Sequence, residues 1–101
     1  MYDFEQRENE KQREKEEVEM NRKNDLNDVR IVLSTAAGRR FLKRIMRECA
    51  VRENIFHSDA MVMAATAGRQ SVGNDLLKDV IAVAPLAVPV VLGLIEESTK
   101  E

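Results

Sequence analysis

Residues Thr35 to Ala50 read TAAGRRFLKRIMRECA, and in this stretch basic and apolar side chains lie on opposite sides of one predicted helix. At about 100° per residue, five cations share one arc of roughly 140°; they form the basic stripe, Arg39, Arg40, Lys43, Arg44 and Arg47. The opposite side carries Phe41, Leu42, Ile45, Met46 and Cys49. The apolar side therefore predicts packing on a core, while the stripe faces phosphate groups, an acidic protein surface or water.

The length and composition of the chain bound its fold class. Of the 101 residues, only about 75 remain to build a core once the charged first quarter is set aside. Charged residues make up 34% of the chain and aromatic residues 4%, with no Trp, which is typical of helical or partly disordered proteins. We predict an all-α fold, with a small three- to four-helix domain over residues 24–101 and a charged arm over residues 1–23.

The charged arm differs from the rest of the chain in its charge balance. Residues 1–25 carry nine acids against six bases, a local net charge of −3, whereas residues 26–101 carry ten bases and nine acids. The arm has no Gly or Pro and few apolar groups, so it is either a solvated helix or disordered by itself. The acidic arm and the basic stripe can meet within one chain or between neighbouring copies.

Capping signals predict where the first two helices of the domain begin. Asn24 or Asp25 can cap a helix that runs to about Leu33, and Thr35 can cap the helix that carries the basic stripe. Gly38 falls in the first turn of that second helix, where it is unfavourable by about 1 kcal/mol relative to Ala. We therefore expect Gly38 to approach another backbone closely, or to admit an anion to the exposed amides.

Ser58 and Asp59 predict the start of a third helix that runs to about Ala84, where Pro85 stops it. Within it, Gly68 and Gly73 are expected to let a crossing helix come close. A last helix is expected over about Leu86 to Glu97. Between the second and third helices, Ile55 and Phe56 are expected to pin the connecting loop to the core.

The sequence carries no pattern for catalysis, a metal site or a cofactor. His57 is the only histidine and lacks a neighbouring nucleophile, so we expect a capping or surface role. A single cysteine, Cys49, cannot form a disulfide within the chain and is expected to pack in the core. The apolar run Val80 to Ile95 is short for a bilayer and contains two prolines, so no membrane span is expected. We therefore predict a protein that is not an enzyme, with the basic stripe as its main functional signal and a solvated face as the plain alternative.

Three local patterns resemble the Bbp-like family of small proteins of short-tailed bacteriophages, which are encoded among head and portal genes. The first joins Asp25-Leu26 and Leu33-Ser34-Thr35 to Gly38-Arg39-Arg40-Phe41-Leu42, then Cys49-Ala50-Val51 and Phe56. The second is Gly68-Arg69-Gln70-Ser71-Val72-Gly73 with Leu76-Leu77 and Asp79, and the third is Ala84-Pro85 followed by an apolar segment ending in Glu96-Glu97. Together they cover about residues 25–98 and leave out the arm.

The resemblance implies a helical component of virion or procapsid assembly without enzymatic activity. Its expected partners are the phage portal or other head proteins, in a homo-oligomer or another multicopy assembly. Its expected location is the virion, after assembly in the host cytoplasm. Contact with packaged DNA is an additional expectation, and the alternative function is a nucleic-acid-binding or regulatory module that acts through the basic stripe.

Overall fold

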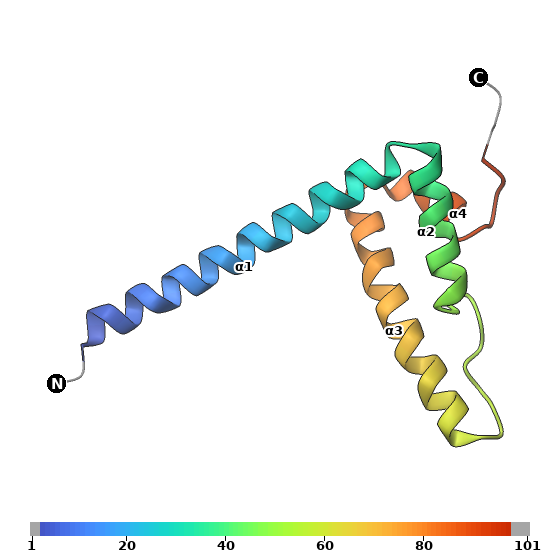
Figure 1. Cartoon of the computed structure of the whole chain (residues 1–101), viewed down its shortest axis with the longest axis horizontal. Coiled ribbons are helices and arrows are strands. Elements are labelled where there is room, and N and C mark those ends of the chain that lie inside the picture. Colours follow the sequence, from blue (N-terminus) through green and yellow to red (C-terminus); the bar gives the residue numbers. More distant parts are fainter. Residues whose placement is uncertain (1–2, 98–101) are drawn as a thin grey trace.

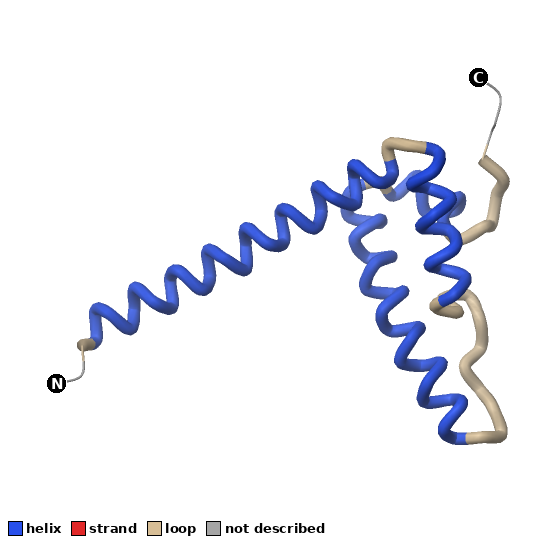
Figure 2. Tube along the Cα trace, in the orientation of Figure 1, coloured by secondary structure: helices blue, strands red, loops and turns tan. Residues whose placement is uncertain are grey.

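A computed structural model, which describes residues 3–97, shows an all-α protein, as the sequence predicts. Within these residues the helices are α1 (Phe4–Leu33), α2 (Ala36–Glu48), α3 (Ala60–Val83) and α4 (Val88–Val91), with a 3-10 turn, η1 (Pro85–Ala87), before α4. No strand is present in this part of the chain (Figure 2). The helix α1 projects from a body in which α2 and α3 pack together beside the C-terminal segment (Figure 1).

From Phe4 onward the arm is a continuous part of α1. The side chain of Asp3 caps the helix by accepting a hydrogen bond from the backbone N–H of Gln6 at 3.2 Å. The helix then continues through good helix formers to Leu33, and the backbone N–H of Ser34 donates to the carbonyl of Ile31 at 3.1 Å. The predicted helix start near Asn24 or Asp25 was therefore wrong, and the solvated-helix alternative describes the arm.

The buried core lies where the four helices meet. Each helix contributes one residue to it: Leu33 at the end of α1, Leu42 in α2, Val80 in α3 and Val91 in α4. Partly buried apolar side chains surround this cluster: Val29, Val32, Ile45, Leu77, Val83, Ala84, Ala87 and Val88. The core therefore depends on the corner between α1 and α2 and on the fold-back of the chain after Ala84.

The helix α3 begins and ends where the sequence predicts, but only part of its length buries large apolar side chains. The Asp59 carboxylate accepts from the backbone N–H of Met61 at 2.8 Å, and Pro85 follows directly after the C-cap Ala84. The C-terminal half buries Val80, whereas Met61 is 82% exposed and Val72 is 57% exposed. No helix of the described chain is both long and apolar enough to cross a membrane.

The expected last helix over Leu86 to Glu97 is instead much shorter. Pro89 lies in the first turn of α4, and Gly93 adopts a positive φ of 73° just after it. The backbone N–H of Leu94 donates to the carbonyl of Pro89 at 2.8 Å, and that of Gly93 donates to Val90 at 3.0 Å. These two bonds form a Schellman motif, which ends the helix because glycine adopts the left-handed conformation without strain.

The three glycines expected to support helix packing lie in different surroundings. A Cβ on Gly38 would overlap the carbonyl oxygen of Val32, so Gly38 permits the close corner between α1 and α2. A Cβ on Gly73 would lie 2.6 Å from the Cβ of Cys49, so Gly73 permits the turn after α2 to pack on α3. By contrast, nothing lies within 4 Å of a Cβ on Gly68. Among residues 3–97 of a single chain, no crossing helix packs against Gly68.

Two aromatic residues expected to be buried are on the surface. Phe56 is 78% exposed, so it does not pin the connecting loop, and Phe41 is 50% exposed. The carboxamide of Gln70 holds the loop instead, because its Nε2 donates to the carbonyls of Ala50 and Glu53, each at 2.9 Å. A polar clamp between α3 and the loop thus replaces the predicted apolar contact.

Candidate functional site

The rotation of α2 decides which members of the basic stripe face outward. Thr35 caps the helix by accepting from the backbone N–H of Gly38 at 2.9 Å, and Leu42 and Met46 are buried on its inner side. On the outer side Arg40, Arg44 and Arg47 are exposed, and these three residues are called the open stripe below. None of the three forms an ion pair with a residue that the structure describes.

Arg39 is separated from the open stripe by its own contacts. Its guanidinium forms an ion pair with Glu97, and its Nη1 donates to the carbonyl of Leu33 at 2.8 Å. Both charged side chains are 27% exposed. The hydrogen bond from Arg39 lowers the pKa of Glu97, and the same bond raises the pKa of Arg39. Arg39 thus ties the C-terminal segment to the corner between α1 and α2.

Phe41 contributes an apolar surface beside the open stripe. The Arg44 guanidinium lies over its ring, 5.2 Å from the ring centroid. Phe41 lies about 100° around the helix from Leu42, so burial of Leu42 leaves Phe41 at the margin of the inner face. An exposed cation–π contact of this kind contributes about 0.5–1 kcal/mol. The surface combines guanidinium groups with one aromatic ring.

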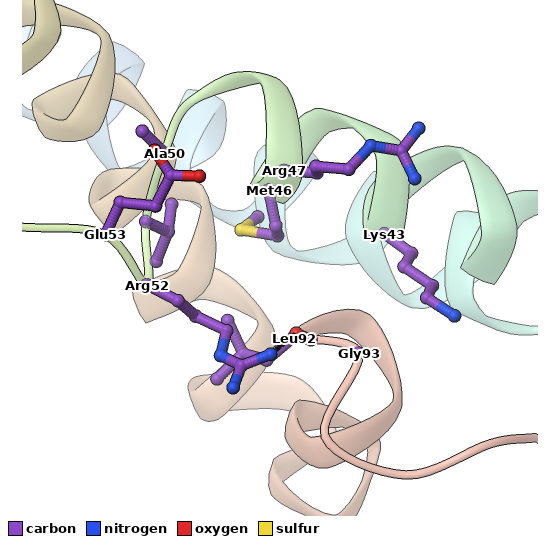
Figure 3. Close-up of a pocket in the computed structure, with 9 residues that line it drawn as sticks. Lys43, Met46, Arg47, Ala50, Arg52, Glu53, Leu92 and Gly93 are labelled. Atoms are coloured by element: carbon purple, nitrogen blue, oxygen red, sulfur yellow. Dashed lines mark hydrogen bonds between the residues drawn. The ribbon is translucent and has the colours of Figure 1, made fainter.

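A hollow of about 420 Å³ lies at the C-terminal end of α2. Figure 3 shows the residues that line it: Lys43, Met46, Arg47, Ala50, Val51, Arg52, Glu53, Leu92 and Gly93. The half-buried Lys43 lies beside Gly93, while Arg52 donates through Nη1 to the carbonyl of Leu92 at 3.2 Å. Lys43, which the sequence placed in the basic stripe, thus lines this hollow and also borders the outer surface of α2.

Arg52 and Gln70 make polar contacts that the sequence did not predict. Arg52 follows a turn in which Ala50 has a positive φ of 53°, and its side chain reaches the carbonyl of Leu92 at the end of α4. Gln70 lies on α3 and reaches the carbonyls of that same turn. No periodic pattern marks either residue, because both contacts join segments that are distant in sequence.

His57 and Cys49 have local structural contacts. The Nδ1 of His57 accepts from the backbone N–H of Asp59 at 2.9 Å, next to the start of α3. Cys49 is half-buried and packs against Gly73. Among residues 3–97, no group of three or more His, Cys, Asp or Glu side chains gathers in a way that could hold a metal ion.

The open stripe suits a ligand that carries negatively charged oxygens. Arginine offers paired N–H donors that match the oxygens of a carboxylate or a phosphate, and it keeps its charge at all physiological pH values. No acidic residue interrupts α2 before Glu48. This surface can therefore bind an acidic protein face or a nucleic-acid backbone.

Comparison with known proteins identifies a phage protein family. The model of the Bbp19-like phage protein family matches residues 29–87, which contain the corner between α1 and α2, both of the longer body helices and η1. The arm and α4 lie outside the matched residues. No curated protein and no solved structure matches the chain significantly.

Proposed function

Because the chain belongs to the Bbp19-like phage protein family, we propose that it is a non-enzymatic structural or assembly protein of the phage particle. It acts in several copies, attached to the portal or inside the head, and it binds neighbouring protein subunits. The open stripe is the main charged contact surface. Its place of action is the virion, after assembly in the host cytoplasm.

The extended shape of the chain is the main support for this proposal. Its radius of gyration is 18.8 Å, against about 13 Å for a compact domain of this length. Large apolar side chains remain on the surface, including Met61 at 82% exposed and Leu86 at 92% exposed. A small core with so much open surface is typical of a subunit that is completed by its neighbours.

Mass spectrometry of purified particles tests this proposal. Presence in mature virions at many copies per particle is the expected result. Presence in procapsids alone would assign the protein to assembly and exclude a permanent virion role. Absence from both kinds of particle would contradict the proposal.

A second candidate function is supported by the open stripe itself. Three exposed guanidinium groups on one helix can neutralise about three phosphates, so duplex DNA binding would fall with salt with a log–log slope of about −3. A gel shift at low salt tests this function, with Arg40→Gln, Arg44→Gln and Arg47→Gln combined as the comparison. Binding that the triple variant retains, or no binding by either protein, would contradict it.

A further inference from the structure

Glutamates lie on two opposite sides of the arm. Glu10, Glu14 and Glu17 occupy one side over about 10 Å, and the longer series on the other side is called the acidic face below. Four glutamates recur along it with Gln12 among them, within an arc of about 80° and a length of about 21 Å; they are Glu5, Glu8, Glu16 and Glu19. The first base within this arc is Lys23, and Lys15 lies about 20° outside it. The acidic face is therefore the counterpart of the open stripe, which runs along α2 without an acid before Glu48.

The acidic face lies clear of the body of the protein. Every residue from Asp3 to Asp25 is exposed, and Figure 1 shows this part of α1 projecting away from the other helices. Arg22 forms an ion pair with Asp79 of α3 at 2.6 Å, which joins the C-terminal end of the arm to the body. A helix this exposed, with few apolar groups, gains little from its own chain.

The acidic face and the open stripe of one chain cannot meet while α1 stays helical. Glu19 precedes Leu33 by fourteen residues, so it lies about 21 Å along the helix from the corner with α2. From that corner α1 leads away from α2 (Figure 1). The sequence left open whether the arm meets the stripe within a chain or between copies, and the geometry favours contact between copies.

We propose that the acidic face of α1 in one copy binds the open stripe of a second copy. This inference rests on the proposed multicopy function and names the partner of its charged surface. Carboxylates at helical spacing meet guanidinium groups at helical spacing, which is the geometry that charge-assisted hydrogen bonds require. The two surfaces differ, so the contact is heterologous and can repeat from copy to copy.

Exposed ion pairs are individually weak and are screened by salt. The contact therefore requires several pairs acting together, and self-association should decrease as ionic strength rises. Complementary charge of this kind mainly determines which surfaces meet and how fast they associate. Self-association of the full chain is thus the property to measure.

Sedimentation velocity of charge-reversed variants provides the test. The arm variant carries Glu8→Lys, Glu16→Lys and Glu19→Lys, and the stripe variant carries Arg40→Glu, Arg44→Glu and Arg47→Glu. The matched control carries Glu10→Lys, Glu14→Lys and Glu17→Lys, which make the same charge change on the opposite side of α1. The unmodified protein and the control should associate at low salt and dissociate at high salt, whereas the arm and stripe variants should each stay monomeric.

Mixing the two monomeric variants gives the sharpest outcome. An equimolar mixture should form complexes, because each reversed surface then meets an oppositely charged surface on the other variant. An unmodified protein that stays monomeric at low salt, or an arm variant that associates like the control, would overturn the proposal. If the open stripe binds duplex DNA and charge reversal of the arm leaves self-association unchanged, the stripe is a nucleic-acid-binding surface and the proposal is overturned. Absence of the protein from particles would contradict the proposed function and leave these association results standing.

Discussion

Gly38 lies so close to Val32 that a Cβ on Gly38 would overlap the Val32 carbonyl oxygen. Substitution Gly38→Ala should therefore open the corner between α1 and α2. The steric cost, about 1–3 kcal/mol for overpacking, should exceed the gain of about 1 kcal/mol in helix propensity. Thermal unfolding should show a lower melting temperature than that of the unmodified protein.

The substitution Gly68→Ala is the control for this prediction. Nothing lies within 4 Å of a Cβ at that position, so only the gain of about 1 kcal/mol in helix propensity should remain. The melting temperature should rise. A fall at Gly68 equal to that at Gly38 would show that neither effect comes from the corner.

Leu42 and Phe41 are neighbours on α2 with different burial. Leu42 is 6% exposed and Phe41 is 50% exposed. Substitution Leu42→Ala should lower the free energy of unfolding by about 2–5 kcal/mol, and Phe41→Ala should lower it by clearly less. Chemical denaturation of both variants measures the difference, and equal losses would place Phe41 in the core after all.

The ion pair between Arg39 and Glu97 should respond to acid. The hydrogen bond from Arg39 lowers the pKa of Glu97 from its ordinary value of 4.5. The stabilisation is therefore fully present above pH 4.5 and is lost as the pH falls through the lowered pKa. Carbon NMR titration of the Glu97 carboxyl should give a midpoint below 4.5, and Arg39→Gln should raise it. An unchanged midpoint would mean that Arg39 does not hold this carboxylate in solution.

The arm should gain protection when the protein is assembled. Its basic residues are trypsin sites in an exposed helix that has little support in the isolated chain. Trypsin should therefore cut between Arg7 and Lys23 quickly in the isolated protein and slowly in assembled particles. Equal cleavage in both states would indicate a solvated arm without a partner.

The local signals in the sequence were sufficient to predict the capped starts of α2 and α3 and the all-α class. Thr35 and Asp59 act through backbone groups two or three residues away, so their effect can be read from adjacent positions. The outer position of Arg40 also follows from helical spacing alone. These features require no knowledge of how the helices pack.

Other features depend on contacts between distant segments. Periodicity places Phe41 on the apolar side of α2, whereas the packing of Leu42 and Met46 leaves it half exposed. Arg39 belongs to the predicted stripe by spacing, and its partner Glu97 lies 58 residues further along the chain. The early end of α4 depends on the Schellman motif at Gly93, which a count of apolar residues does not predict.

The central claim is that the open stripe is an interface in the phage particle. Its most direct test is incorporation of a variant with Arg40→Gln, Arg44→Gln and Arg47→Gln into particles, measured beside its melting temperature. Exposed charges contribute little to folding, so melting should stay nearly unchanged while the amount of variant per particle falls. Normal incorporation together with normal melting would contradict the claim and leave the stripe a solvated surface.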